Sequence, residues 1–362
     1  MRARSLAKCM TWIWTLAFSG LATVTPVVAT ASGGDDPADL VRVFTAAYRA
    51  GDWQAAATVG LRIVSLEPDR PVHRYNLACV YARAGSADEA VSWLGQAAAG
   101  GFWQSGLLAR DSDLDGVRSH PGFAAAAAAV DRNHATIREV VAERFTAAPP
   151  LLVTPTGNDA TRPAPLVVAL HGYGGRADDY PMLWRGAAAR AGAVLVIPQG
   201  VRRAGSGYSW QDPDEAELIL ELTLEWTRRQ VAIDEDRIVL TGFSQGGFIA
   251  MALGVRRPEL FAGVIPMAGG YLPQIDAPPA AAATGAPRFY FMVGSLDGVA
   301  LAVRQAAEDF ATAGYQVRLR VLPGTGHSFP RDTVRELSKA LRFALGGSAP
   351  KSQQQRAATG AE

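Results

Sequence analysis

Cysteine is nearly absent from this sequence. The 362 residues include two cysteines, Cys9 and Cys79, and five histidines. We expect Cys9 to be lost with an N-terminal segment, so no intrachain disulfide can form even in an oxidising compartment. No cysteine or histidine cluster has the spacing of metal ligands. The sequence therefore predicts a fold that depends on packing, with no metal and no cofactor.

An excess of either charge is also absent. Lysine and arginine together number 35 against 34 for aspartate and glutamate, and no basic block interrupts the chain. Electrostatic capture of nucleic acid needs such a block, so we expect no nucleic-acid partner. The hydrophobic share of 49% is enough to supply cores for two domains of ordinary size.

Long apolar runs are missing except near the start of the chain. Basic residues precede an apolar stretch from Met10 to Val28, and the small residues Ala29-Thr30-Ala31 follow it. This pattern predicts a secretory signal peptide over residues 1–31, export to the periplasm or the medium, and no membrane span after processing. The alternative is an uncleaved membrane anchor, although polar residues and Pro26 dilute the run.

Residues 36–131 are rich in alanine and helix formers and contain an internal period. Gly51 and Gly85 are 34 positions apart, as are Ala56 and Ala90. This is the period of a helix-turn-helix repeat, and the segment resembles tetratricopeptide repeats. The resemblance implies an all-helical domain whose concave face binds a protein or peptide partner. Residues 132–162 are expected to hold a linker, partly helical, and the first strand.

From residue 151 onward the hydrophobic pattern of the sequence changes. Short, continuous apolar runs now alternate with helical stretches. Such runs predict strands buried on both faces, and the alternation predicts a doubly wound, mostly parallel α/β sheet over residues 163–345. The expected strands cover residues 151–153, 166–170, 193–197, 237–240, 263–266, 289–293 and 317–321. The polar residues 346–362 are expected to form a disordered tail.

One of these strands leads into Gly242-Phe243-Ser244-Gln245-Gly246, which is followed by an apolar helical run. Glycines on both sides of a serine suit a sharp strand-to-helix turn, because a Cβ would clash where the backbone doubles back. Ser244 is therefore expected to be an exposed nucleophile. The backbone N–H of Gln245, at the start of the helix, is expected to stabilise an oxyanion.

Three other strand ends carry polar residues. His171-Gly172-Tyr173 follows one strand, Asp297 follows another and His327 follows the last. Serine, then carboxylate, then histidine is the chain order of a nucleophile-elbow hydrolase. We therefore assign His327 as the base, Asp297 as the acid that orients it, and the N–H of Tyr173 as a second oxyanion donor. His171 competes as the base, but we expect it to brace its loop by hydrogen bonding.

These motifs together resemble the α/β-hydrolase fold and, within it, the phospholipase/carboxylesterase family of serine esterases. The resemblance implies hydrolysis of small carboxylic esters through an acyl-enzyme at Ser244. Tyr208, Trp210 and Phe243 are expected to line the substrate pocket. The stretch before His171 also resembles feruloyl esterases and polyester depolymerases, so the ester class stays open.

A peptidase of the same fold, or a binding protein with an inactive hydrolase domain, are the remaining alternatives. For the esterase, the stretch from Gly269 to Ala286 is too poor in large apolar residues to form a lid. The sequence therefore predicts an open crevice that favours short to medium acyl groups.

Overall fold

A computed structural model describes residues 36–155, 162–210, 213–269, 278, 280–282 and 284–346. The expected signal peptide, most of the stretch expected to lack a lid, and all but the first residue of the expected tail lie outside these ranges. The chain divides into two compact units, residues 1–139 and 140–362. The division falls inside α6 (Phe123–Ala147), so much of the segment expected to link the domains is helical.

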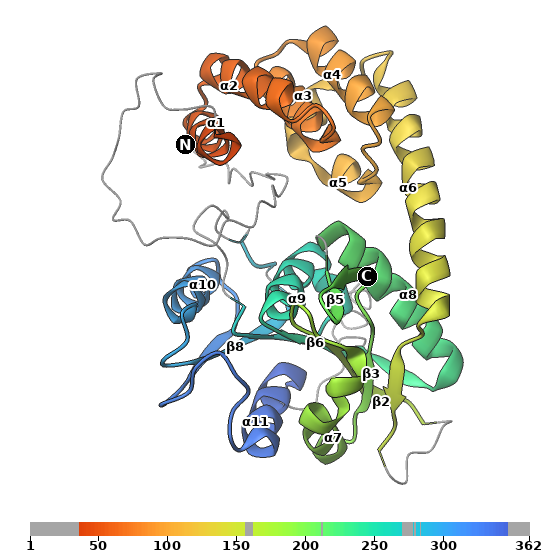
Figure 1. Ribbon diagram of the computed structural model, residues 1–362, viewed down its shortest axis with the longest axis vertical. Helices are drawn as coiled ribbons and strands as arrows, with labels where there is room; N and C mark the ends of the chain where they lie inside the picture. Colours follow the sequence, from red (N-terminus) through yellow and green to blue (C-terminus); the bar gives the residue numbers. More distant parts are fainter. Residues whose placement is uncertain are drawn as a thin grey trace, which may run out of the picture. The chain divides into compact units, whose positions relative to one another are not determined.

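The first unit is helical throughout its described part, as predicted. It is built from α1 (Pro37–Ala50), α2 (Trp53–Leu66), α3 (Pro71–Arg83), α4 (Ala87–Ala99), α5 (Ser105–Arg110), the 3-10 helix η1 (Ser112–Val117) and the start of α6. Figure 1 shows these helices in red to yellow.

The predicted period of 34 residues reappears in the turns of this unit. Gly51, directly after α1, has a φ of 74°, and Gly85, two residues after the end of α3, has a φ of 83°. Positive φ values of this size favour glycine. The next residue in each case donates its N–H to a carbonyl five positions earlier: Asp52 to Ala47 at 3.0 Å and Ser86 to Tyr81 at 2.9 Å. Two helical hairpins therefore end their first helices in the same way.

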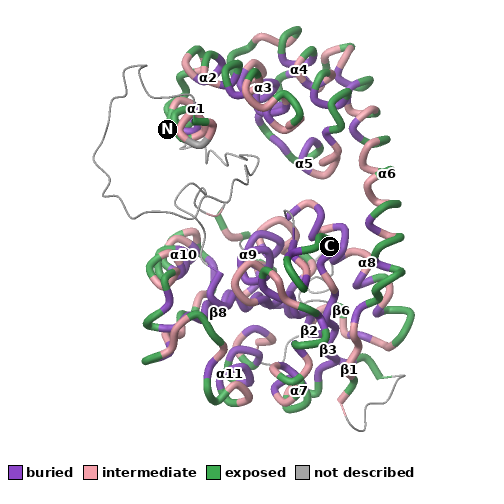
Figure 2. Tube along the Cα trace, in the orientation of Figure 1, coloured by how far each residue is buried: buried purple, intermediate pink, exposed green. Residues whose placement is uncertain are grey.

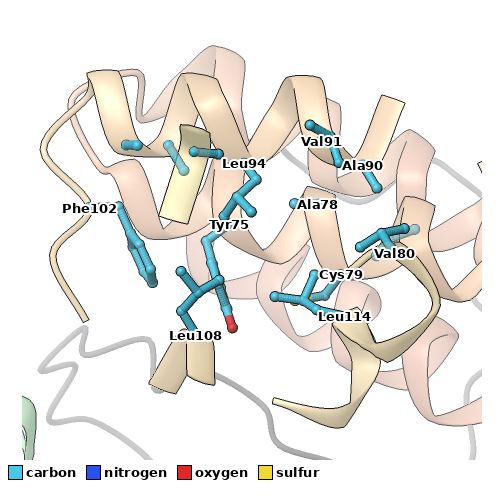
Figure 3. Close-up of a cluster of buried hydrophobic side chains, with 14 of the residues drawn as sticks. Tyr75, Ala78, Cys79, Val80, Ala90, Val91, Leu94, Phe102, Leu108 and Leu114 are labelled. Atoms are coloured by element: carbon cyan, nitrogen blue, oxygen red, sulfur yellow. The ribbon is translucent and has the colours of Figure 1, made fainter. Parts of the chain in front are cut away.

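An aromatic stack lies within the core of this unit. The rings of Tyr75 and Phe102 lie 4.3 Å apart and nearly parallel, among the buried side chains that Figure 3 shows. The Tyr75 hydroxyl donates to the buried carboxylate of Asp111 at 2.7 Å. This bond ties the loop before η1 to α3, while Cys79 is buried beside it as a free thiol.

The second unit contains, within its described residues, a seven-stranded sheet in the order β1-β3-β2-β6-β7-β8-β9. The strands are β1 (Leu151–Val153), β2 (Ala164–Leu170), β3 (Val194–Ile197), β6 (Ile233–Phe243), β7 (Gly263–Met267), β8 (Arg288–Gly294) and β9 (Val317–Leu322). β1 is antiparallel to β3, and the other neighbours are parallel. Each predicted strand is present, and the doubly wound, mostly parallel fold is confirmed.

Helices cover both faces of this sheet. α7 (Pro181–Arg190) and α11 (Thr333–Leu345) lie on one face, and α8 (Pro213–Gln230), α9 (Gln245–Arg256) and α10 (Ala300–Thr312) lie on the other (Figure 1). Short 3-10 helices, η2 (Ala177–Asp179) and η3 (Pro258–Leu260), complete the connections. Every residue of β2, β3 and β7 is buried, and Figure 2 shows the centre of the sheet in purple. Burial on both faces explains why these strands appear in the sequence as unbroken apolar runs.

A small hairpin was not predicted. β4 (Arg202–Ala204) and β5 (Gly207–Ser209) pair as an antiparallel two-stranded sheet after β3. Tyr208 of β5 also pairs with Gly175: Gly174 donates to the Tyr208 carbonyl at 2.8 Å, and Tyr208 donates to the Gly175 carbonyl at 3.0 Å. The hairpin therefore holds the glycine-rich loop that follows β2.

Candidate active site

Ser244 lies at the junction between β6 and α9, in a strained backbone conformation. Its φ is 55° and its ψ is −118°, values that a non-glycine residue adopts only when its surroundings impose them. The Ser244 N–H donates to the Met267 carbonyl at 2.8 Å, and the Ser244 carbonyl accepts from Phe248 at 3.0 Å. These bonds fix the serine between the end of a strand and the first turn of a helix.

The glycines on either side of Ser244 are required by close backbone contacts. A Cβ on Gly242 would lie 2.2 Å from the Gly246 carbonyl oxygen, and one on Gly246 would lie 2.5 Å from the His171 carbonyl oxygen. The prediction that a side chain would clash at these positions is confirmed. The sharp turn that results places Ser244 at the carboxyl edge of the sheet.

His327 connects Ser244 to Asp297 through two hydrogen bonds. Its Nε2 lies 2.9 Å from Ser244 Oγ, and its Nδ1 lies 2.8 Å from Asp297 Oδ2. An ionised carboxylate only accepts hydrogen bonds, so Nδ1–H donates to Asp297 and Nε2 is left to accept from the serine hydroxyl. The three predicted residues, each at a different strand end, therefore form one hydrogen-bonded chain.

The environments of these three side chains differ. The Asp297 side chain is 1% exposed, whereas that of His327 is 45% exposed. The second carboxylate oxygen of Asp297 accepts from the Val299 N–H at 3.0 Å, which fixes the carboxylate plane. Phe243 and His327 have ring centroids 4.9 Å apart, and Phe243 stacks on Phe329 at 4.8 Å. The imidazole is therefore held from the side but is open to solvent and substrate.

Two backbone segments with candidate oxyanion donors meet at Ser244. Gln245 begins α9, so its N–H is among those that a helix leaves without an intrahelical acceptor. The loop after β2 also reaches Ser244, because a Cβ on Gly172 would lie 3.4 Å from Ser244 Cβ. The next residue, Tyr173, has an N–H on this same loop and a side chain that is 62% exposed. The side chain of Tyr173 thus lies on the surface beside the candidate nucleophile.

His171 is buried and braces the loop, as predicted. Its Nδ1 lies 2.8 Å from the Gly172 carbonyl oxygen, and its Nε2 lies 3.0 Å from the Gly200 N and 2.7 Å from Gln199 Nε2. A backbone N–H can only donate, so Nε2 accepts and Nδ1 carries the proton. Burial lowers the pKa of His171 from 6.5 to about 4. A neutral imidazole with both nitrogens engaged is a structural support and has no free nitrogen for general base chemistry.

Trp210 does not line a pocket, which corrects the expectation from sequence. Its side chain is 1% exposed, its Nε1–H donates to the His171 carbonyl at 2.8 Å, and its ring lies 4.9 Å from the His171 ring. An indole whose face and N–H are both used within the core cannot contact a substrate. The tryptophan instead supports the loop that carries Tyr173.

Tyr208 and Phe243, the other two expected substrate residues, are both partly exposed. The Tyr208 ring lies beneath the Arg203 guanidinium at 4.6 Å on the β4–β5 hairpin, and Phe243 packs beside His327. Phe243 is therefore adjacent to the candidate base, and Tyr208 is adjacent to the glycine-rich loop.

Sequence reasoning missed two polar side chains that hold the glycine-rich loop. The Tyr180 hydroxyl accepts from the Gly172 N–H at 2.9 Å. Gln199 bonds His171 with its amide nitrogen, and with its oxygen accepts from the Ala177 N–H at 2.9 Å. Gln199 follows β3 by two residues, so the rule that polar residues at strand ends have functional roles would have found it. Nothing in the sequence around Tyr180 indicates its contact with Gly172.

The part of the chain that the structure describes contains no group of three or more His, Cys, Asp or Glu side chains that could hold a metal ion. The same ranges contain no helix long and apolar enough to cross a membrane.

Comparison with known protein families gives a match over the part of the chain that contains Ser244, Asp297 and His327. Residues 213–345 match the model of the Phospholipase/Carboxylesterase family. This stretch is therefore similar to the phospholipases and carboxylesterases of that family. The resemblance noted in the sequence is thereby confirmed for this stretch, which contains Ser244, Asp297 and His327.

Curated relatives of this chain carry the names of esterases and of depolymerases. The protein NocK of Nocardia uniformis subsp. tsuyamanensis, which carries the name of an esterase, is 32% identical over 152 residues, covering 40% of this chain and 43% of NocK. Poly(3-hydroxyalkanoate) depolymerase C of Paucimonas lemoignei is 30% identical over 125 residues, 32% of this chain and 30% of the depolymerase. Feruloyl esterase C of Emericella nidulans is 28% identical over 133 residues, 35% of this chain and 48% of the esterase. The chain thus spans less than half the length of each of these relatives.

Solved structures similar to this chain include esterase PE8, with 24% identity, a TM-score of 0.44, and coverage of 54% of this chain and 98% of that protein. A carboxylesterase from Mesorhizobium loti has 20% identity, a TM-score of 0.44, and coverage of 52% of this chain and 92% of its own.

Proposed function

We propose that this protein hydrolyses carboxylic esters through a covalent acyl-enzyme on Ser244. The observation that carries the proposal is the pair of hydrogen bonds that His327 makes, 2.9 Å to Ser244 Oγ and 2.8 Å to Asp297 Oδ2. A serine hydroxyl is a poor nucleophile unless a base takes its proton, and His327 Nε2 lies within hydrogen-bond distance to do so.

In the first half of the reaction, Ser244 Oγ attacks the ester carbonyl carbon while its proton passes to His327 Nε2. The carbonyl π electrons move to oxygen and form a tetrahedral oxyanion. When this intermediate collapses, the bond to the alcohol oxygen breaks and His327 returns the proton to that oxygen. The alcohol leaves and the acyl group stays on Ser244.

The second half uses water in place of the alcohol. His327 takes a proton from water, the hydroxyl attacks the acyl carbon, and the collapse returns the proton to Ser244 as the acid is released. Asp297 keeps the imidazole in the tautomer with a proton on Nδ1 and stabilises the imidazolium that forms in both halves. Its burial strengthens this interaction, because few water molecules can screen the carboxylate.

The backbone N–H groups of Gln245 and Tyr173 are the proposed oxyanion donors. The N-terminal position of Gln245 in α9 adds the helix dipole, which favours negative charge at that end. The approach of Gly172 to Ser244 supports the assignment of Tyr173, since the two residues are adjacent on one loop. Removing a single donor of this kind lowers kcat by about 10² to 10³ in a serine protease.

For the substrate, we propose an ester with a short to medium or aromatic acyl group. His327 is 45% exposed and Tyr173 is 62% exposed, so the described part of the site is open on the side where an acyl group approaches. An open site gains little from long chains, because each methylene contributes about 0.8 kcal/mol only when it is buried. Partly exposed Phe243 and Tyr208 would offer flat apolar faces, which suits aromatic acids such as ferulate.

A substrate panel tests this proposal. We expect p-nitrophenyl esters to give kcat/KM values that peak between acetyl and octanoyl, and a feruloyl ester to be turned over as well. A steady rise through palmitoyl esters, or a jump in rate above the solubility limit, would contradict the open site. The amide of the best acyl group should react far more slowly than its ester. Faster turnover of the amide would favour the peptidase alternative.

Two further proposals concern the rest of the chain. We infer that the helical unit binds a protein or peptide partner, on the strength of its paired helical hairpins. We also infer that residues 1–31 direct export and are removed. Mass spectrometry of the protein recovered from cells and medium tests the second inference, since cleavage after Ala31 would leave Ser32 as the first residue.

A further inference from the structure

An open pocket of about 450 Å³ lies in the second unit beside α11, at the amino ends of β8 and β9. Arg288, which lines it, is the first residue of β8, whereas Gly294, which leads to the Asp297 loop, is the last. Because the strands are parallel, the pocket lies at the opposite edge of the sheet from Ser244. Its volume is in the range of sites that bind small molecules.

Four cationic side chains line this pocket: Arg288, Arg318, Lys339 and Arg342. They come from β8, from β9 and from two successive turns of α11. The remaining lining residues are uncharged, so no carboxylate is among them. Four like charges around one cavity repel one another, and the arrangement is most stable when an anion lies between them.

The arginines are held in place by contacts that leave donors free. The Arg318 guanidinium lies 4.9 Å from the centre of the Phe343 ring, a cation–π contact that uses the face of the guanidinium and leaves its N–H groups at the edge. Arg288 Nε donates to the Gln316 side chain at 3.1 Å. Its terminal nitrogens pass over Gly346, where an added Cβ would lie 2.5 Å from Nη1. A glycine at that position makes room for the guanidinium.

The buried acid Glu336 is shared between Lys339, which lines the pocket, and two arginines that do not. Glu336 is buried and accepts from Arg320 at 2.8 Å, from Lys339 at 3.0 Å and from Arg335 at 3.3 Å. Burial alone would raise its pKa, but the hydrogen bonds from Arg320 and Lys339 outweigh burial and lower the pKa of Glu336 to about 2. Within the described residues, Glu336 therefore pairs with the pocket lysine but with none of the three pocket arginines. Within the described residues, Arg342 forms no ion pair or hydrogen bond.

We propose that this pocket binds an anion of the phosphate class, with two or more negative charges. Planar guanidinium groups donate two parallel hydrogen bonds to phosphate oxygens, and the three arginines here come from three different elements around one pocket. A tetrahedral anion has acceptors for all three, and a second negative charge engages the lysine. The site is distant from the triad and does not depend on the esterase proposal.

Calorimetric titration of the full chain with sodium pyrophosphate tests the proposal. Added sodium chloride keeps the ionic strength at about 0.15 M, so that the screening of charges by salt is the same in every titration. We expect saturable binding that Arg342→Gln and Arg318→Gln each weaken at least tenfold. Arg342→Gln is the safer variant for folding, because that side chain is exposed and has no ion pair or hydrogen bond to lose within the described residues. Arg304→Gln, at an exposed position on α10, removes the same charge outside the pocket and should bind as the wild type does.

Two results would contradict the proposal that this pocket binds a phosphate-class anion. One is pyrophosphate binding no stronger than that of chloride, and the other is equal weakening by Arg304→Gln. A further binding experiment with lipid vesicles identifies the source of the phosphate. If phosphatidylcholine vesicles bind the protein only when they contain phosphatidic acid, and Arg342→Gln abolishes this, the natural ligand is a lipid headgroup. Pyrophosphate binding without vesicle binding identifies a soluble phosphate compound.

Discussion

The side-chain amide of Gln245 forms two hydrogen bonds with the backbone of Trp210. Its oxygen accepts from the Trp210 N–H at 3.1 Å, and its nitrogen donates to the Trp210 carbonyl at 2.8 Å. Trp210 in turn donates its indole N–H to the His171 carbonyl at 2.8 Å. Side-chain hydrogen bonds therefore join the first residue of α9 to the segment after the β4–β5 hairpin, and that segment to the start of the glycine-rich loop.

We expect Gln245→Met, which keeps the length of the side chain and removes both bonds, to lower kcat about tenfold. The reason is that both proposed oxyanion donors lie on segments that these bonds hold in register, and a net hydrogen bond contributes about 1 kcal/mol. Steady-state kinetics on a short ester measure the effect. Gln305→Met, at an exposed position on α10, is the matched control and should leave kcat unchanged. If Gln245→Met raises KM with kcat intact, the bonds contribute equally to ground-state and transition-state binding, and the proposed effect on the oxyanion donors is contradicted.

Asp297→Asn should lower kcat by roughly 10⁴, by analogy with the same change in a serine protease. The amide cannot stabilise the imidazolium, and it favours the wrong tautomer of His327. Asp309→Asn is the control, because Asp309 lies on α10 and accepts from Gln305 at 2.9 Å. Circular dichroism checks that both variants fold. A larger loss of activity in folded Asp309→Asn would mean that the acid has been assigned to the wrong residue.

Stability of the second unit should fall in mild acid because of His171. Burial lowers its folded-state pKa to about 4, while the unfolded value is 6.5. The unfolded chain therefore binds a proton first, so the contribution of His171 is fully present above pH 6.5 and is lost as the pH falls toward 4. Between pH 7 and pH 5 the loss is about 2 kcal/mol of unfolding free energy.

Urea unfolding of the wild type and His171→Gln at pH 7 and pH 5 measures this effect. The variant should be less stable at pH 7 but should lose less stability on going to pH 5. His120→Gln, at a partly exposed position in the helical unit, should keep the pH dependence of the wild type. Identical pH dependence in wild type and His171→Gln would show that folding does not lower the pKa of His171.

A truncated chain that begins at Arg138 should keep kcat on a soluble ester within about tenfold of the full chain. All proposed catalytic residues lie in the second unit, which begins at Val140. The truncation point matters, because Val141 and Phe145 of α6 are buried and a start near Ala147 would remove them. A folded truncation without activity would show that the helical unit shapes the active site.

Most of the fold and the core of the candidate site could be predicted because their signals are local. The turn at Ser244 depends on glycines within two positions, and the strands buried on both faces are continuous apolar runs. The chain order of Ser244, Asp297 and His327, each after a strand, was enough to place them at one edge of a parallel sheet.

The features that could not be predicted depend on contacts between distant residues. Trp210 looked like a pocket wall, but its indole bonds a carbonyl 39 positions away, and nothing in Tyr208-Ser209-Trp210 indicates this contact. The bond between Tyr180 and Gly172 depends on how α7 packs beside the loop. The cationic pocket could not be predicted from the sequence either, because its residues are spread over β8, β9 and α11 and no short motif joins them.

The most direct test of the esterase mechanism is covalent labelling with a fluorophosphonate, followed by mass spectrometry of the modified peptide. An activated serine attacks such a phosphorus centre at neutral pH, whereas an ordinary serine does not. We predict one adduct, on Ser244, and its loss together with all but a trace of esterase activity in Ser244→Ala. An adduct on another residue, or substantial activity in a folded Ser244→Ala variant, would contradict the mechanism.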